Sequence, residues 1–476
     1  MMTQCSDIIA NSNIQFGTSG ARGLVDDFTP EVCGAFTQAF VEQMQSEYEF
    51  SGVVLAIDNR PSSPAIAEAC AGVIKQLGLA VYYYGVVPTP ALAYQAMQDK
   101  MPAIMVTGSH IPFDRNGLKF YRPDGEITKA DESAILGFNV SYIGAVEHAL
   151  PAISTLAAEQ YTQRNAGLYA DHVLAGKRIG IYEHSSAGRD LYAAIFASLG
   201  AEVISLERTD TFVPIDTEAV AEEDRVKARQ WSAEHQLDAI FSTDGDGDRP
   251  LIADETGEWL RGDIVGLLCA QLLNIQALAV PVSCNTAIEK SNSFEKVVRT
   301  RIGSPYVIAA FEALAAEFKR LAGFEANGGF ILGSDVELNG QVLKALPTRD
   351  ALLPGIVLIA GAASAGKLLS ELVASLPARY TASDRIKDVP TQWSRELLTA
   401  GAEQPEVLLS KIGFTETIDA VDTTDGLRLT LASGDIVHLR PSGNAPELRC
   451  YAESGDQAVA EAIVVKALKG VKVLTP

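Results

Sequence analysis

The chain has 476 residues, of which 47% are hydrophobic; this is enough to bury several cores and predicts three or four globular domains. Its formal net charge is −22, because 60 Asp and Glu outweigh 38 Lys and Arg. This charge argues against nucleic acid or a membrane surface as a partner, so an anionic substrate would need local cationic groups.

Three further features concern the cellular setting. The six cysteines are widely scattered, without the close pairs of zinc or redox motifs, so we expect reduced thiols. Residues 1–13 lack the basic and apolar segments of a signal peptide, so we expect a cytoplasmic protein. The uncharged stretches 264–288 and 352–366 are too polar or too short for a membrane span, and a buried helix followed by a strand is the better interpretation of each.

One pattern occurs three times: an apolar strand, a loop, an alanine-rich helix and a second strand. Alternating strands and helices predict an α/β fold with mixed or largely parallel sheets covered on both faces. The chemistry is then expected in loops at strand ends. The predicted strand, helix and strand are 53–57, 64–77 and 80–84 in the first copy, 178–182, 191–199 and 202–206 in the second, and 278–282, 286–294 and 296–300 in the third, which is the weakest.

The C-terminal part has a different pattern. Residues 427–431 and 435–439 alternate between apolar and polar, and an alanine-rich helix is expected near 457–468, which predicts a smaller α+β domain. Polar or helical connectors suggest the domain limits. The four expected domains are 1–150, 151–254, 255–376 and 377–476.

The first domain contains two glycine-bearing loops with hydroxyl groups. Residues 16–23 include Arg22 and suit phosphate, although they match neither a P-loop nor a dinucleotide motif. Ser109 follows an apolar strand, which makes it a candidate nucleophile or phosphate carrier; a hydrolase triad is disfavoured because no Gly-x-Ser-x-Gly elbow surrounds it and His110 is its immediate neighbour. Lys119 lies on the next strand and would assist proton transfer or hold phosphate, whereas an isolated lysine there would be a solvated edge residue.

The second domain contains Asp244, Asp246 and Asp248, spaced by glycines after the apolar segment 237–243. The glycines let alternate carboxylates converge on a small cation such as Mg²⁺, and Arg249 adds a positive charge for a second anion. An EF-hand calcium loop is the main alternative, but Arg249 stands where its glycine belongs and a strand precedes the loop. A solvated acidic turn is the other alternative.

Two more glycine-punctuated loops follow. Residues 323–330 offer Glu325 and Asn327, which suit neighbouring sugar hydroxyls. Residues 440–449 combine two arginines with a hydroxyl and exposed amides, which predicts a phosphate clamp. Each loop alone is typical of an ordinary turn, but the five together predict a site assembled at domain junctions.

With these five loops in order, the chain resembles the α-D-phosphohexomutase superfamily over essentially its whole length. The resemblance implies three related α/β mixed-sheet domains and a smaller C-terminal α+β domain around a central cleft. It implies that phosphate moves from Ser109 to a hexose 1- or 6-phosphate, through a bound hexose 1,6-bisphosphate. The substrate would be a small hexose phosphate, with no nucleic acid or membrane partner.

The resemblance also implies roles for the residues at matching positions. Ser109 would be the phosphoserine, and it would hold Mg²⁺ together with Asp244, Asp246 and Asp248. The other implied groups are His110, Arg22 and Lys119 for catalysis; Arg249, Arg301, Gly303, Glu325 and Asn327 for substrate binding; and Arg440, Ser442, Gly443, Asn444 and Arg449 for the nonreacting phosphate.

The chain departs from common family patterns at several positions. The common motif Thr-Ala-Ser-His-Asn-Pro reads Thr-Gly-Ser-His-Ile-Pro here, so Gly108 replaces Ala and Ile111 replaces Asn. Asn327 and Gly329 stand where Ser and His are common. The forms Glu-Ala-Asn-Gly-Gly-Phe and Ser-Gly-Asn-Ala-Pro-Glu-Leu-Arg resemble bacterial phosphomannomutases that supply GDP-mannose synthesis, which favours mannose 1-phosphate and mannose 6-phosphate as substrates. The alternatives are a phosphoglucomutase or dual-specificity enzyme, a phosphatase, and a non-catalytic sugar-phosphate binding protein.

Overall fold

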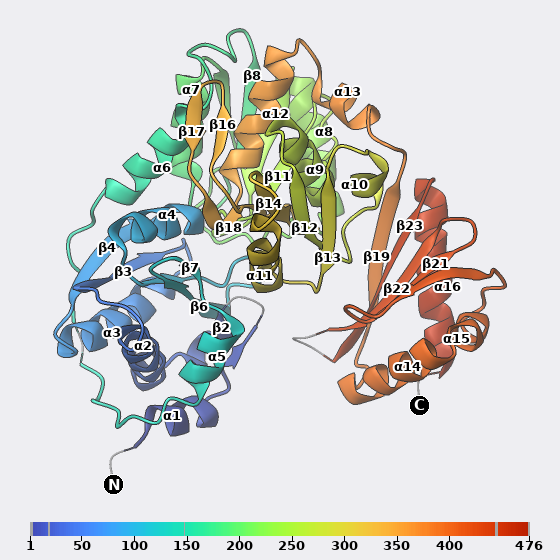
Figure 1. Cartoon of the computed structure of the whole chain (residues 1–476). Helices are drawn as coiled ribbons and strands as arrows, with labels where there is room; N and C mark the ends of the chain where they lie inside the picture. The colour runs from blue at the N-terminus through green and yellow to red at the C-terminus, as the bar shows by residue number, and fades with distance from the viewer. Residues whose placement is uncertain (1–2, 18–19, 147, 443–445, 475–476) are drawn as a thin grey trace. The chain divides into compact units, whose positions relative to one another are not determined.

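The computed structural model describes residues 3–17, 20–146, 148–442 and 446–474 (Figure 1). It forms two compact units: Met1–Gln276 with Gly303–Val373, and Ala277–Ile302 with Ala374–Pro476. Within the described ranges, no helix combines the length and the apolar character needed to cross a membrane.

The first sheet of the first unit is mixed, in the order β1-β2-β6-β5-β3-β4, with β7 paired to β6. Strand β3 is buried at every position, as expected for an apolar strand covered on both faces, and it pairs in parallel with β4 and β5. The strands are β1 (Gln15–Phe16), β2 (Ala21–Leu24), β3 (Gly52–Ile57), β4 (Ala80–Val86), β5 (Ala103–Val106), β6 (Arg115–Arg122) and β7 (Gly125–Glu126).

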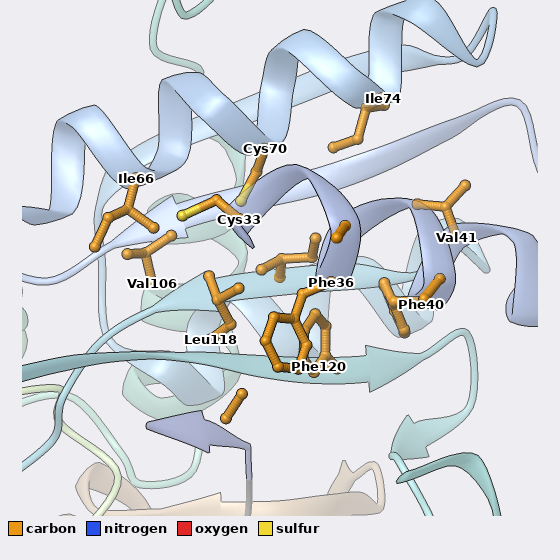
Figure 2. Packing of buried hydrophobic residues seen from close by; sticks show 14 of the residues in the cluster. Cys33, Phe36, Phe40, Val41, Ile66, Cys70, Ile74, Val106, Leu118 and Phe120 are labelled. Carbon is orange, nitrogen blue, oxygen red and sulfur yellow. The ribbon is translucent and has the colours of Figure 1, made fainter. Parts of the chain in front are cut away.

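Aromatic and aliphatic side chains fill the space between this sheet and its helices. Figure 2 shows Phe36 and Phe40 of one helix pointing toward Phe120 of β6, and the rings of Phe40 and Phe120 are 4.8 Å apart. This packing fixes β5, which is followed by the Ser109 loop, and β6, which carries Lys119. The helices are α1 (Cys5–Asn11), η1 (Val25–Asp27), α2 (Pro30–Gln45), α3 (Ser63–Gln76), α4 (Thr89–Asp99) and α5 (Lys129–Leu136).

The second sheet has the order β11-β10-β8-β9 and contains the second predicted copy. Both of its predicted strands are found at the expected limits, and the helix between them lies within two residues of its prediction. Its elements are α6 (Leu156–Ala166), β8 (Arg178–Tyr182), α7 (Arg189–Ser198), β9 (Glu202–Leu206), α8 (Glu222–His235), β10 (Ala239–Thr243) and β11 (Pro250–Ala253).

The first unit also contains the antiparallel strands β14, β15 and β18, and a small β16–β17 hairpin. The buried helices predicted within 264–288 and 352–366 are present as α9 and α12. A strand follows α9 at Ala277–Pro281, as predicted, but the strand predicted after the second helix is wrong, because another helix follows α12. The elements are α9 (Gly262–Leu272), α11 (Ser304–Ala315), β14 (Leu321–Phe324), β15 (Phe330–Leu332), β16 (Val336–Leu338), β17 (Gln341–Leu343), β18 (Leu346–Asp350) and α12 (Leu352–Ser364); α13 (Leu369–Ala374) follows at the end of this unit.

The third predicted copy lies in the second unit. Strands β12 (Ala277–Pro281) and β13 (Lys296–Thr300) pair in parallel, but the helix predicted over 286–294 is only α10 (Ala287–Lys290). Asn292 has a φ of 52°, in the left-handed region, and a helix cannot continue through that conformation.

The C-terminal part of the second unit is an antiparallel sheet in the order β19-β23-β22-β21-β20, as expected for the smaller α+β domain. The terminal helix runs six residues beyond its predicted end. The elements are β19 (Tyr380–Lys387), α14 (Thr391–Glu403), α15 (Pro405–Lys411), β20 (Ile418–Asp422), β21 (Leu427–Leu431), β22 (Ile436–Pro441), β23 (Glu447–Ser454) and α16 (Gln457–Leu474). The predicted α/β fold class with a distinct C-terminal domain is confirmed.

Candidate active site

Ser109 lies in the turn that follows β5, in a backbone conformation that non-glycine residues rarely adopt. Its φ is 54°, and its side chain is fully buried. The Ser109 amide donates to Thr107 Oγ1 at 2.8 Å, and the Thr107 hydroxyl donates to Asp58 Oδ2 at 2.7 Å. The surrounding hydrogen bonds therefore hold the strained turn in place.

Arg60 stabilises the same loop by donating hydrogen bonds to its backbone carbonyl oxygens. Its guanidinium is buried, pairs with Asp58 at 3.1 Å, and donates to the carbonyl oxygens of Ser109 at 2.9 Å and Ile111 at 2.6 Å. A Cβ atom on Gly108 would lie 2.6 Å from Arg60 Cζ, so the glycine makes room for this arginine. Arg60 and Asp58 were not predicted from the sequence, although their position directly after a fully buried strand was an available signal.

The three predicted aspartates converge in the loop between β10 and β11. Asp244, Asp246 and Asp248 are fully buried, and one oxygen from each lies within 4.8 Å of the others. Ser109 Oγ donates to Asp244 Oδ2 at 2.7 Å, although the two residues are 135 positions apart. An antiparallel strand pair flanks the loop instead of the helices of an EF-hand, and complete burial excludes a solvated turn.

Two cations from other strands lie against these carboxylates. Lys119 Nζ on β6 donates to Asp246 at 2.5 Å and to Asp248 at 2.6 Å. Arg349 on β18 pairs with Asp248 at 3.0 Å. Burial acts to raise the pKa of Asp246, but Lys119, Thr89 and Arg249 together hold the pKa below its ordinary value.

Asp244 behaves differently because no cation contacts it as closely. Burial, followed by the negative charges of Asp246 and Asp248, raises its pKa well above the ordinary value. The Oδ1 atoms of Asp246 and Asp248 are buried without a hydrogen-bond partner among the described residues. The three converging carboxylates and these two unpartnered oxygens fit a small divalent cation.

His110 and Arg249 lie beside Ser109. Arg249 Nη1 donates to His110 Nδ1 at 2.7 Å, and His110 Nδ1 is also 3.4 Å from Ser109 Oγ. Burial, and then the charge of Arg249, lowers the pKa of His110 to about 3, so its imidazole is neutral at physiological pH. Because Nδ1 accepts from Arg249, the ring proton is on Nε2.

Arg22 reaches the same group of charges from β2. Its strand pairs with β6, placing Arg22 opposite Gly117, two residues before Lys119. Burial, and then the charges of Arg249 and Arg349, lowers the pKa of Arg22 to about 10, which still leaves it positively charged at neutral pH.

The predicted sugar loop between β14 and β15 is also linked to the aspartate loop. Glu325 and Asn327 are buried, and Glu325 Oε2 lies 3.2 Å from Arg349 Nη1. Asn327 Oδ1 accepts from the Gly329 amide at 3.0 Å, which closes the turn. Gly303 precedes α11 with a φ of 134°, a conformation that favours glycine. Arg349 and Thr89, which donates to Asp246, were missed from sequence.

In the second unit, two predicted arginines contact neighbouring residues, Asp425 and Thr424, and Asp425 was not predicted from the sequence. Arg440 Nε donates to Asp425 Oδ1 at 2.7 Å, while Arg301 Nε donates to the neighbouring Thr424 carbonyl at 3.3 Å. Ser442 and Arg449 lie at the adjoining ends of β22 and β23. Gly443 and Asn444 lie outside the described residues.

Comparisons with known proteins agree with this geometry. Three family models match: phosphoglucomutase/phosphomannomutase alpha/beta/alpha domain I over residues 13–138, alpha/beta/alpha domain III over 261–380, and the C-terminal domain over 373–469. A phosphomannomutase from Salmonella muenchen is 60% identical over 467 residues, covering 98% of this chain and 97% of that protein.

Solved structures share the fold. A structure of a protein from Thermus thermophilus has a TM-score of 0.78 at 22% identity, covering 97% of this chain and 99% of that one. The Aspergillus fumigatus N-acetylphosphoglucosamine mutase, in complex with GlcNAc-6P and magnesium, has a TM-score of 0.61 at 13% identity, covering 99% and 98%. The matched domains and the close full-length relative show that the chain belongs to the phosphoglucomutase/phosphomannomutase family.

Proposed function

We propose that this protein is a phosphomannomutase, an isomerase that interconverts mannose 1-phosphate and mannose 6-phosphate. The observation that carries the proposal is the buried hydroxyl of Ser109, 2.7 Å from the first of three converging aspartates. The 60% identity to the Salmonella muenchen phosphomannomutase supports mannose as the sugar.

The proposed cofactor is Mg²⁺, held by one oxygen from each of Asp244, Asp246 and Asp248 and by a phosphate oxygen on Ser109. The unpartnered buried oxygens support this assignment, as does the magnesium in the structure of the Aspergillus fumigatus mutase. When bound, the ion would neutralise charge on the phosphoryl group in transit.

The chain's own residues would surround the transferring phosphate with positive charge. Lys119 and Arg22 supply two cations, and Arg249 supplies a third while orienting the neutral imidazole of His110. In this proposal phosphorylated Ser109 transfers its phosphate to the free hydroxyl of the sugar. The bond from phosphorus to Ser109 Oγ breaks, the bond from phosphorus to the sugar oxygen forms, and the hydroxyl proton passes to Ser109 Oγ. The product is a bound hexose 1,6-bisphosphate, which also serves as activator. Phosphate then returns to Ser109 from the other end.

The remaining assignments place the substrate. Glu325 and Asn327 would bind sugar hydroxyls, with Arg301 and Gly303 contributing to the substrate site. The nonreacting phosphate would be bound by Arg440, Ser442, Gly443, Asn444 and Arg449. We further propose the four domains 1–150, 151–254, 255–376 and 377–476, and a cytoplasmic location.

Phosphorus NMR tests the function directly. The protein is incubated with Mg²⁺, a trace of hexose 1,6-bisphosphate and, in separate samples, mannose 1-phosphate or glucose 1-phosphate. Faster conversion of mannose 1-phosphate to its 6-phosphate supports the proposal. Preferred conversion of glucose would make the protein a phosphoglucomutase, release of inorganic phosphate would make it a phosphatase, and unchanged spectra would favour a binding protein.

A further inference from the structure

Arg349 links the aspartate loop to the sugar loop. Its side chain extends from β18, is 1% exposed, and places Nε and Nη2 at 3.1 and 3.0 Å from Asp248 Oδ2. The third guanidinium nitrogen, Nη1, lies 3.2 Å from Glu325 Oε2. One rigid planar group therefore fixes the distance between two loops that are far apart in sequence.

The stem of Arg349 occupies space that a side chain at position 329 would otherwise need. A Cβ atom on Gly329 would lie 2.6 Å from Arg349 Cδ and 2.7 Å from Cγ, closer than real Cβ contacts allow. The backbone of Gly329 forms the turn itself, because its carbonyl accepts from the Glu325 amide at 3.3 Å. Gly329 and Arg349 thus form a complementary pair.

A third carboxylate, that of Glu126, interacts electrostatically with the guanidinium. Burial acts to lower the pKa of Arg349, but the negative charges of Asp248, Glu325 and Glu126, in that order of effect, keep it well above its ordinary value. Glu126 is itself fixed by hydroxyls, since Ser304 and Thr348 each donate to it at 2.7 Å. The guanidinium is therefore constrained, and its direction toward Glu325 is determined by the structure around it.

We propose that Arg349 is a positioning residue for substrate recognition. It holds the Glu325 carboxylate at a set distance from the metal-binding loop, in the space left free by Gly329. This inference rests on the proposed function, because it assigns Glu325 to the sugar hydroxyls. Arg349 acts through Glu325 and Asp248, without being assigned a contact to the transferring phosphate.

Steady-state kinetics of Arg349→Lys, Gly329→Ala and Glu325→Gln test the inference. We expect Arg349→Lys to raise KM for hexose 1-phosphate by about tenfold, because lysine cannot bridge two carboxylates in a planar fork. Gly329→Ala should raise KM similarly without removing a charge, because the new Cβ displaces the arginine stem. Lys344→Ala, which removes an exposed cation paired with Asp335, is the matched control and should leave KM unchanged.

A double-mutant cycle separates positioning from general destabilisation. If Arg349 acts through Glu325, adding Arg349→Lys to Glu325→Gln should raise KM by no more than about twofold over the worse single variant. Fully multiplicative effects, or a wild-type KM in both Arg349→Lys and Gly329→Ala, would overturn the inference. Failure of the proposed function looks different, because the wild-type protein itself would then not convert mannose 1-phosphate in preference to glucose 1-phosphate, whatever the variants do.

Discussion

The two groups of predicted phosphate-handling residues are built differently. In the first unit, Ser109 and the three aspartates are buried, and cations from β6 and β18 contact two of the carboxylates. In the second unit, Arg440 is partly exposed and pairs with a partly exposed Asp425 at 2.7 Å. This difference suits the proposed roles: a metal-assisted transfer centre requires fixed geometry, whereas a clamp that binds and releases either end of a sugar bisphosphate has to exchange its ligand.

The two groups should also differ in how much their ion pairs contribute to the free energy of unfolding. Removing one member of a buried ion pair leaves an uncompensated charge and costs about 3–5 kcal/mol, whereas an exposed pair contributes about 0–1 kcal/mol. Substitutions in the first group should therefore affect both stability and turnover. Substitutions in the second group should affect binding with little loss of stability.

The largest expected effect is that of Ser109→Ala, which removes the proposed phosphate carrier. We expect turnover to fall by at least about a thousandfold in the coupled mutase assay, because the variant lacks the hydroxyl proposed to carry the phosphate. Ser133→Ala, at an exposed serine on α5, is the control and should be fully active. Undiminished activity of Ser109→Ala would contradict the assignment.

Lys119→Met tests the buried side of the comparison. It leaves Asp246 and Asp248 without their closest cation, so we expect the free energy of unfolding to fall by about 3–5 kcal/mol in urea titrations without metal. Turnover should fall as well. If stability in the absence of metal were unchanged, the lysine would not be compensating the aspartates.

Addition of Mg²⁺ should stabilise the same region. At a concentration of about 100 times Kd, an ion that binds only the folded state adds about 2.7 kcal/mol to the free energy of unfolding. Thermal unfolding with and without EDTA measures this gain, and Asp246→Asn should abolish most of it. Equal stabilisation of the wild type and the variant would place the ion elsewhere.

The smallest expected effect on stability is that of Arg440→Ala in the second unit. We expect the free energy of unfolding to change by no more than about 1 kcal/mol, because the Arg440 pair with Asp425 is partly exposed. KM for the hexose phosphate should rise by about tenfold, since the variant loses one proposed contact to the nonreacting phosphate. A large loss of stability with an unchanged KM would remove the distinction between the two regions.

Features with a local signal were predictable from the sequence. The strands 178–182, 202–206 and 296–300 were predicted at their observed limits, because apolar runs between turns are typical of covered strands. The helix at 286–294 was overestimated, because a left-handed residue such as Asn292 has no clear periodic signal. Arg349 was missed for a related reason: nothing near it in sequence indicates which carboxylates it contacts.

By itself, the sequence determined the repeated α/β elements, the glycine-spaced loops and the family to which they belong. Tertiary structure alone decided which of these groups meet. Ser109 and Asp244 are 135 residues apart, and Arg349 and Asp248 are 101 residues apart. Their contacts depend on how separate sheets pack. Burial, which shifts the pKa of a charged group or leaves an oxygen without a hydrogen-bond partner, is likewise a property of the packed fold and not of any short segment.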